Sequence, residues 1–211
     1  CVVMAAEKMG VKRLVFLSSC SVYGGREGEA KETHPLIPRN VYSRTKLEGE
    51  EIVKAANLDT VTLRLFNVYG PRQREGGYAG VISKWLQAAL EGKPCIIEGT
   101  GDTTRDFVHV KDVASAIALC ATRKEPFKGK VLNIGTGREA SLWDVWGAIR
   151  DAYGGGIGVE LAAARKGDVL RSKANVERAK FELGWQANIT LEDGVRRLVY
   201  VALHPQESGF I

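Results

Sequence analysis

The sequence predicts an α/β protein with a mostly parallel sheet, and three observations lead to this fold class. Short apolar runs of strand length alternate along the chain with longer stretches of helical spacing. Several runs are continuous, such as RLVFLS at 13–18, as expected of parallel strands that are buried on both faces. Glycine and proline mark the intervening loops, for example at 70–71 and 154–156. Strands and helices that alternate in this way favour a parallel sheet.

Each element is expected where its pattern is found. Runs rich in β-branched and apolar residues predict strands at 13–18, 60–65, 95–98, 106–110, 130–134 and 157–161. Apolar residues that recur at helical spacing predict helices at 1–9, 41–56, 79–91, 112–123, 142–152, 175–183 and 191–203.

The string GTGREA at 135–140 imitates a G-x-G-x-x-A dinucleotide fingerprint, and Glu160 stands near the spacing of a ribose-binding acid. In a true fingerprint the helix begins at the glycines, so that its amides face the pyrophosphate. Here Ser141 and Asp144 form an S-x-x-D box that starts the helix later. We therefore expect this loop to be structural.

Composition excludes several classes of protein. The 211 residues, 45% hydrophobic and 26% charged, suffice for one large domain or two small ones. No apolar run reaches the roughly 18 residues of a membrane-spanning helix. The net charge of +5 is either ordinary variation or a sign of an anionic ligand, and the basic residues are not gathered into a nucleic-acid face. The cysteines form no CxxC pair, which favours a reducing cytoplasm over a zinc or disulfide framework: Cys1, Cys20, Cys95 and Cys120.

Polar side chains gather where the first strand ends. In LSSCSVYGG, Ser18, Ser19 and Ser21 stand beyond the carboxyl end of the strand, where ligands sit in open parallel sheets. In the next helix, Tyr42 and Lys46 of YSRTK share one face. An ammonium near a phenol lowers the phenol's pKa from about 10, so Tyr42 is a candidate general acid/base. The structural alternatives are turn-capping serines and a solvated helix face.

Five ordered blocks carry a family resemblance: SSCSVYG, YSRTK, LRLFNVYGPR, RDFVHVKDV and LNIGTG. Together they resemble the extended short-chain dehydrogenase/reductase family of NAD-dependent epimerases and dehydratases, and most of all the UDP-glucose 4-epimerases. The later strings RKGDV at 165–169 and ELGW at 182–185 also fit.

The resemblance implies a Rossmann-like parallel sheet with a smaller α/β substrate-binding domain. Residues 1–70 plus about 111–135 would form the C-terminal part of the NAD-binding domain. Residues from about 71–110 plus 136–211 would bind the nucleotide sugar. It also implies that the N-terminal half of the Rossmann domain, about 90–100 residues, is missing before Cys1, so we expect the chain alone to be inactive.

The resemblance also assigns roles to single residues. Tyr42 takes the place of the catalytic acid/base, Lys46 that of the nicotinamide-ribose ligand, and Ser19 that of the sugar-hydroxyl partner. The cofactor, NAD, would be bound by Ser18, Tyr42, Lys46 and Phe66. The substrate, a UDP-sugar, would be bound by Ser19, Ser21, Asn67, Arg105, Arg165, Asp168 and Ser172. Guanidinium forks suit a diphosphate, and no metal is expected.

The implied reaction is 4-epimerisation through a transient 4-keto sugar. Cys20 and Ser21 stand where related dehydratases carry a carboxylate, and a hydroxyl cannot replace one as a base. The alternatives are a dehydratase or reductase of the same family, or a non-catalytic RNA-associated member. Ser172 is small enough to admit an N-acetyl group. For the full-length parent we expect a homodimer through the helices at 1–9 and 41–56.

Several other residues are interpreted as structural. His109, inside the apolar string FVHV, is expected to be a core histidine whose ring nitrogens are satisfied. Asp112 is expected to serve the start of the next helix. All four tryptophans are expected to be packing residues rather than a stacking platform: Trp85, Trp143, Trp146 and Trp185.

Overall fold

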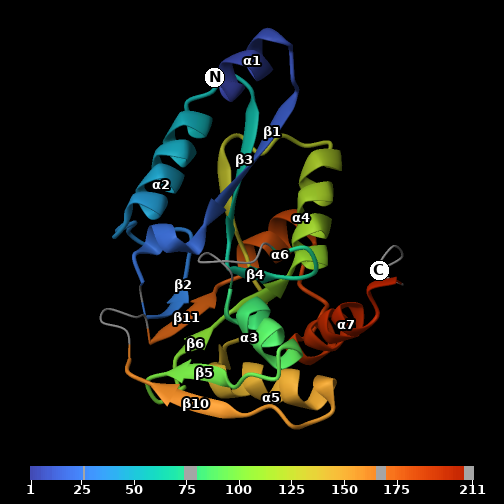
Figure 1. The fold of residues 1–211 in the computed structure, drawn as a ribbon. Coiled ribbons are helices and arrows are strands. Elements are labelled where there is room, and N and C mark those ends of the chain that lie inside the picture. Colours follow the sequence, from blue (N-terminus) through green and yellow to red (C-terminus); the bar gives the residue numbers. More distant parts are fainter. Residues whose placement is uncertain (26, 74–79, 165–169, 207–211) are drawn as a thin grey trace.

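A computed structural model describes residues 1–25, 27–73, 80–164 and 170–206. The chain forms an elongated molecule in which a three-stranded sheet with its helices stands above a lower part of short strands and helices (Figure 1). No helix in these described ranges is long and apolar enough to cross a membrane. The α/β class with a parallel sheet is confirmed.

The upper sheet is parallel and has the order β1 (Arg13–Ser19), β3 (Asp59–Leu65) and β8 (Lys130–Ile134). On β1, Phe16 lies under helix α2 (Val41–Lys54), because a Cβ added to Gly49 would stand 2.5 Å from its ring. The neighbouring Val15 packs in the cluster that contains Val113 of helix α4 (Val110–Thr122). Since successive strand residues point to opposite faces, α2 and α4 cover opposite faces of the sheet.

The lower part is built from three small sheets. Strand β4 (Asn67–Tyr69) pairs with β7 (Phe107–His109), and β5 (Cys95–Glu98) pairs with β10 (Val159–Ala162). The third sheet has the order β2 (Gly28–Ala30), β11 (Arg171–Ala174), β6 (Thr104–Arg105) and β9 (Ala140–Ser141). Helices α3 (Val81–Leu90), α5 (Leu142–Tyr153) and α7 (Leu191–Leu203) enclose a second core beside these strands. The remaining elements are α1 (Val2–Lys8), the 3-10 turn η1 (Cys20–Tyr23) and α6 (Glu177–Leu183).

Local capping explains where the principal helices begin. Asn40 and Ser43 form a capping box that starts α2, and Ser141 and Asp144 form the one predicted for α5. Helix α5 therefore starts after the glycine loop, as expected. The hydroxyl of Thr190 accepts the Asp193 amide at the start of α7.

Every predicted strand and helix is observed, with shifts at the ends. The largest shift in a strand is at 157–161, which is observed as Val159–Ala162. Five short strands were not predicted: β2, β4, β6, β9 and β11. The division into two domains stays a prediction, and α6, assigned to the second domain, packs against β8 of the upper sheet.

One structural interpretation needs correction. His109 is buried and its Nδ1 accepts the Lys111 amide at the start of α4, but its Nε2 has no partner among the described residues. Burial lowers the pKa of His109, which keeps the ring neutral and able to act as this cap. Trp143 is 38% exposed, but its ring packs edge-to-face on that of Trp146, and its indole N–H donates to the carbonyl oxygen of Thr100.

Candidate active site

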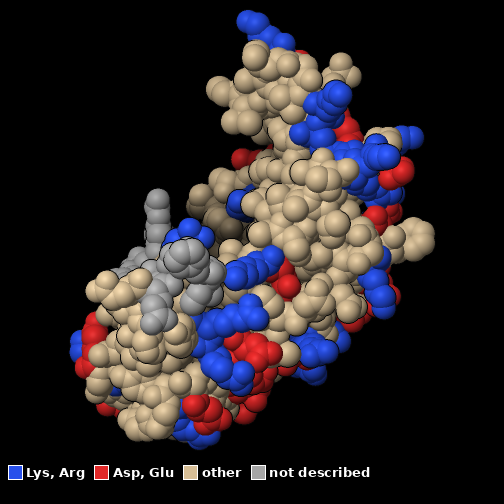
Figure 2. Space-filling model, turned by 90° about the vertical axis from the view of Figure 1, so that its right-hand side faces the viewer, with Lys and Arg blue, Asp and Glu red and all other residues tan. Residues whose placement is uncertain are grey.

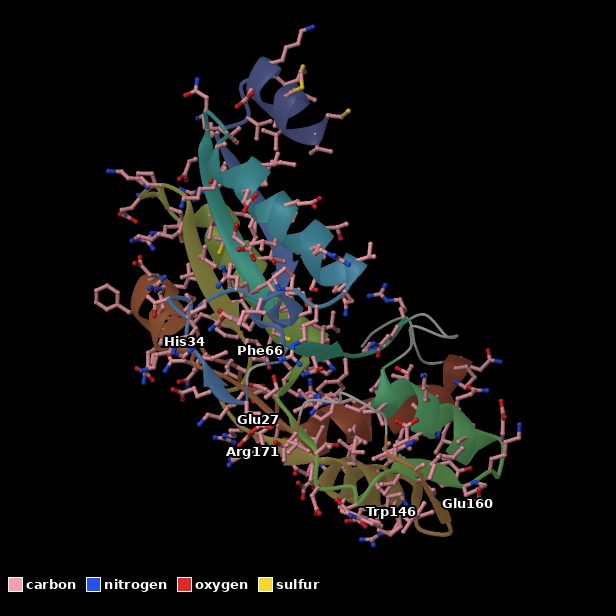
Figure 3. The ribbon with its side chains drawn as sticks, turned by 90° about the vertical axis from the view of Figure 1, so that its left-hand side faces the viewer. Glu27, His34, Phe66, Trp146, Glu160 and Arg171 are labelled. Atoms are coloured by element: carbon pink, nitrogen blue, oxygen red, sulfur yellow. The ribbon has the colours of Figure 1, made fainter. Side chains whose placement is uncertain are left out.

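A pocket of about 240 Å³ lies at the carboxyl end of β1, where the chain passes through η1. Five of the residues predicted for cofactor or substrate binding line it together: Ser21, Phe66, Asn67, Arg105 and Ser172. They come from separate parts of the chain, and Figure 3 places Phe66 where the upper sheet meets the lower part. We call this cavity the smaller pocket.

A second pocket of about 490 Å³ lies under helix α3, with both apolar side chains such as Trp85 and Ile82 and polar ones such as Lys84 in its wall. We call it the larger pocket. Asn67 and Arg105 line both pockets, so the two cavities adjoin at these side chains. A guanidinium and an amide thus lie at the junction of the two cavities.

The junction is fixed from behind by Asp106. Its buried carboxylate accepts hydrogen bonds from Thr136, Gly137 and Ala174. Burial raises the pKa of Asp106, and these hydrogen bonds oppose the rise. The backbone carbonyl oxygen of Asp106 accepts a hydrogen bond from the side-chain amide of Asn67 at 3.0 Å. The glycine loop at 135–140 is therefore packed on Asp106. Glu160, which stands near the spacing of a ribose-binding acid, lies at the lower edge of the molecule, away from Phe66 (Figure 3).

Tyr42 and Lys46 lie on one face of α2, beside the end of β1. The Nζ atom of Lys46 donates to the carbonyl oxygen of Leu17 at 2.9 Å and stands 5.7 Å from the centroid of the Tyr42 ring. Tyr42 is 55% exposed, and its hydroxyl makes no hydrogen bond with any described residue. The phenol and the ammonium thus share an open face that is accessible to a ligand.

The three serines at the end of β1 and in η1 have different surroundings. The Ser19 hydroxyl accepts the Ser21 amide at 3.2 Å and caps η1. The Ser21 hydroxyl is buried and has no partner in the part of the chain that the structure describes. Ser18 is buried, and its hydroxyl donates to Glu50. The cofactor role of Ser18 stays a prediction, and its hydroxyl proton is used in the bond to Glu50.

The wall of the smaller pocket carries no carboxylate among its described residues. Burial, together with the charge of Asp106, raises the pKa of Cys20 to about 12, so its thiol stays protonated at neutral pH. Gly24 closes the wall at a φ of +69°, and a Cβ there would stand 1.9 Å from the carbonyl oxygen of Ile37. A larger residue would therefore strain this turn.

Two predicted substrate ligands, Arg165 and Asp168, lie outside the described residues and stay predictions. In the described ranges no group of three or more His, Cys, Asp or Glu residues is placed to hold a metal. On the face shown in Figure 2, Lys and Arg are interspersed with Asp and Glu.

Sequence reasoning missed a buried polar network under the site, made of Ser18, Tyr23, Glu50, Arg64 and Asn133. Two signals were available. Glu50 follows Lys46 by one helical turn, so it lies on the same side of α2. Arg64 interrupts the apolar strand TVTLRL, where a buried charge requires a partner.

Comparison with known proteins gives one family and several relatives. The profile described as "NAD dependent epimerase/dehydratase family" matches residues 1–135. The UDP-glucose 4-epimerase of Mycolicibacterium smegmatis is 35% identical over 201 residues, covering 92% of this chain and 64% of that protein. The chain therefore spans somewhat less than two thirds of that relative's length.

Two solved structures superpose well on the chain. The UDP-N-acetylglucosamine 4-epimerase from Methanobrevibacter ruminantium M1, in complex with UDP-N-acetylmuramic acid, has a TM-score of 0.89 at 30% identity over 96% of this chain and 66% of that one. The UDP-glucuronic acid 4-epimerase from Bacillus cereus, with UDP-glucuronic acid and NAD, has a TM-score of 0.86 at 27% identity over 95% and 65%.

Proposed function

Because this chain belongs to the NAD-dependent epimerase/dehydratase family, we propose that it carries the acid/base helix and the substrate pockets of a nucleotide-sugar 4-epimerase that uses NAD and a UDP-sugar. One observation carries the proposal. Five side chains from four separate parts of the chain line one pocket, beside the exposed Tyr42 and the half-buried Lys46.

The two adjoining pockets suit the two ends of a nucleotide sugar. The larger pocket, at about 490 Å³, lies within the common size range of ligand sites, and Trp85 and Ile82 in its wall give apolar surface against which a base can pack. The smaller pocket, with Ser21, Asn67 and Ser172 in its wall, would take the sugar. Arg105 and Asn67 at the junction would then bind the diphosphate, where a guanidinium fork is the favoured ligand.

The residues beside the site fit NAD. Lys46 uses one of its three donors on Leu17, which leaves two for a ribose, and the Tyr42 hydroxyl has no partner among the described residues. Phe66 lies in the wall of the smaller pocket. Lys46, Tyr42 and Phe66 would hold the cofactor, which supplies a hydride acceptor and donor when bound.

The chain's own residues would move the proton. The phenolate of Tyr42 would take the proton of the sugar 4-hydroxyl and later return it. The ammonium of Lys46 would stabilise the phenolate by its charge, and the Ser19 hydroxyl would bond the same sugar oxygen. The smaller pocket would hold the sugar while the oxidised carbon exposes its other face.

The same site disfavours dehydration. A dehydratase needs a carboxylate near the sugar for a further proton transfer, and the described wall of the smaller pocket has none. The Cys20 thiol, protonated at neutral pH, cannot replace it. An RNA-associated, non-catalytic role would have no use for Ser19, Tyr42 and Lys46 together.

The test uses the native protein that contains these residues, incubated with NAD and UDP-galactose or UDP-glucose. We expect interconversion of the two sugars without a dehydrated product. Tyr42→Phe should lower kcat by about 10²–10⁴-fold, the usual contribution of a general acid/base. Tyr153→Phe, on α5 and outside both pockets, is the matched control. Wild-type turnover in Tyr42→Phe would refute the proposed role.

A further inference from the structure

A buried ion pair lies directly under the proposed acid/base pair. Arg64 on β3 holds Glu50 on α2 with two hydrogen bonds, Nε to Oε1 at 3.0 Å and Nη2 to Oε2 at 2.7 Å. Both side chains are nearly inaccessible, at 4% for Arg64 and 8% for Glu50. Burial would lower the pKa of Arg64, but hydrogen bonds and charges from Glu50 and Tyr23 raise it above its ordinary value.

One end of this pair fixes the acid/base helix to the sheet. Oε1 of Glu50 also accepts the hydroxyl of Ser18, which pairs in register with Arg64 on the neighbouring strand. A single carboxylate of α2 therefore binds both β1 and β3. Glu50 follows Lys46 by four residues and Tyr42 by eight, so the bond restrains the face that carries both.

The other end reaches the wall of the smaller pocket. Nη1 of Arg64 donates to the Tyr23 hydroxyl at 3.0 Å, and that hydroxyl donates to Asn133 Oδ1 at 2.7 Å. The guanidinium also lies 4.9 Å from the centroid of the Tyr23 ring. Tyr23 lines the smaller pocket, so Arg64 connects the helix of Tyr42 to a residue at the sugar site.

Asn133 extends the connection to a second wall. Its side-chain amide donates to the carbonyl oxygen of Ala30 at 2.8 Å and to that of Asn175 at 3.2 Å. Ala30 lines the smaller pocket and pairs in register with Ala174, two residues after Ser172. The network thus runs from α2 through β3 and β8 to η1, β2 and the end of β11.

Stability alone does not explain such a pair. Removing two charges from water is costly, and an apolar pair of similar volume is often equally stable or more so. What an apolar pair lacks is direction: the planar guanidinium binds Glu50 and Tyr23 at fixed angles. Catalysis depends on such geometry, because small displacements of reacting groups lower the rate strongly.

We propose that the Glu50–Arg64 pair is a positioning device that holds the Tyr42–Lys46 face of α2 at a fixed place relative to the sugar pocket. This rests on the proposed function of that face and pocket. Glu50 and Arg64 touch neither substrate nor cofactor in this assignment and act through Tyr42 and Tyr23.

The main test replaces both charges at once in the full native protein, as Glu50→Leu with Arg64→Met, so that no unpaired charge is buried. With UDP-glucose and UDP-galactose as substrates, kcat should fall about 10- to 100-fold while KM changes less than about twofold. Amide hydrogen exchange should become faster in both 41–50 and 20–30. A kcat within about twofold of the wild type, or unchanged exchange in both segments, would overturn the proposal.

The control is the ion pair at the opposite end of the same strands, where Arg13 on β1 binds its register partner Asp59 on β3 at 2.6 Å. Arg13→Met with Asp59→Asn should lower stability but leave kcat and exchange in 41–50 near wild type. If kcat fell equally in this control, the fall in the Glu50/Arg64 variant would be explained by lower overall stability, and the proposal would be overturned.

A milder variant tests the network if the double variant at Glu50 and Arg64 does not fold. Tyr23→Phe removes only the hydroxyl between Arg64 and Asn133, and should lower kcat about tenfold with faster exchange in 20–30; no change in either would count against the network. If the wild type acts on no UDP-sugar, the proposed function fails, and the exchange measurements on the same variants still decide whether the network holds α2 and the pocket together.

Discussion

The ammonium nitrogen of Lys46 bonds the carbonyl oxygen of Leu17 at 2.9 Å while it stands 5.7 Å from the centroid of the Tyr42 ring. Its charge is thereby fixed near the end of β1, on the side where Ser19 begins the η1 turn. The arrangement depends on α2 starting at its capping box, because Tyr42 lies in the first turn of the helix. One cation is therefore held by the strand and presented to the phenol.

Lys46→Met tests this relationship. The variant keeps most of the apolar stem and removes the charge, so kcat should fall by about 10²-fold, within the range of acid/base effects. The measurement is steady-state turnover of a UDP-sugar by the native-length protein. Lys54→Met, in the last turn of the same helix and exposed, is the matched control and should keep wild-type turnover. Equal turnover in both variants would contradict the role of Lys46.

Arg105→Lys tests the junction of the pockets. Lysine keeps the charge but cannot form two parallel hydrogen bonds as a guanidinium does. UDP should therefore bind about 10- to 100-fold more weakly, which corresponds to the usual free energy of one charge-assisted hydrogen bond. Titration calorimetry with UDP measures this directly. Arg171→Lys, on the neighbouring strand β11 and paired with Glu139 rather than lining either pocket, is the control. Unchanged UDP affinity in Arg105→Lys would remove Arg105 from the diphosphate site.

Periodic apolar patterns predicted the strands and helices whose own residues pack into a hydrophobic core. The strands at 95–98 and 130–134 and the helix at 191–203 are observed with the predicted bounds. The family resemblance is confirmed by the match over residues 1–135. Long apolar runs carry their own signal, because burial against a sheet or helix layer requires it.

The short strands have no such signal. Arg105 on β6 lies between Ser172 of β11 and Ala140 of β9, so its extended backbone depends on partners far along the chain. The buried network was missed for the same reason, since the partners of Arg64 are distant in sequence. Five residues of the smaller pocket were named from the family resemblance, and their individual roles stay predictions.

The pH dependence of stability should contain a contribution from Asp59. One oxygen of its carboxylate accepts a hydrogen bond from Nε of Arg13 at 2.6 Å. The other oxygen accepts hydrogen bonds from the backbone amides of Phe127 and Lys128. Burial would raise the pKa of Asp59, but these hydrogen bonds outweigh it and hold the pKa below its ordinary value. A lowered pKa adds stability above the unfolded-state value of about 3.9, which is lost as the pH falls through the folded-state pKa.

Asp59→Asn removes this titration. The free energy of unfolding of the wild type should therefore exceed that of the variant most at pH 6–7, and the difference should shrink as the pH falls below about 4. Urea denaturation over a series of pH values measures it. A difference that is the same at every pH would show that the carboxylate contributes only its shape and neutral hydrogen bonds.

Sugar selectivity should depend on Ser172. This half-buried side chain lines the smaller pocket on β11, between the register partners Gly28 and Arg105. Its small size leaves room for an N-acetyl group, so we expect UDP-N-acetylglucosamine to be a substrate as well as UDP-glucose. Ser172→Tyr should lower kcat/KM for the N-acetyl sugar at least about tenfold more than for UDP-glucose, since loss of pocket volume discriminates on this scale. Ser172→Ala, which keeps the space, should leave the ratio unchanged. If the tyrosine variant lowers both activities equally, the N-acetyl group does not lie beside residue 172.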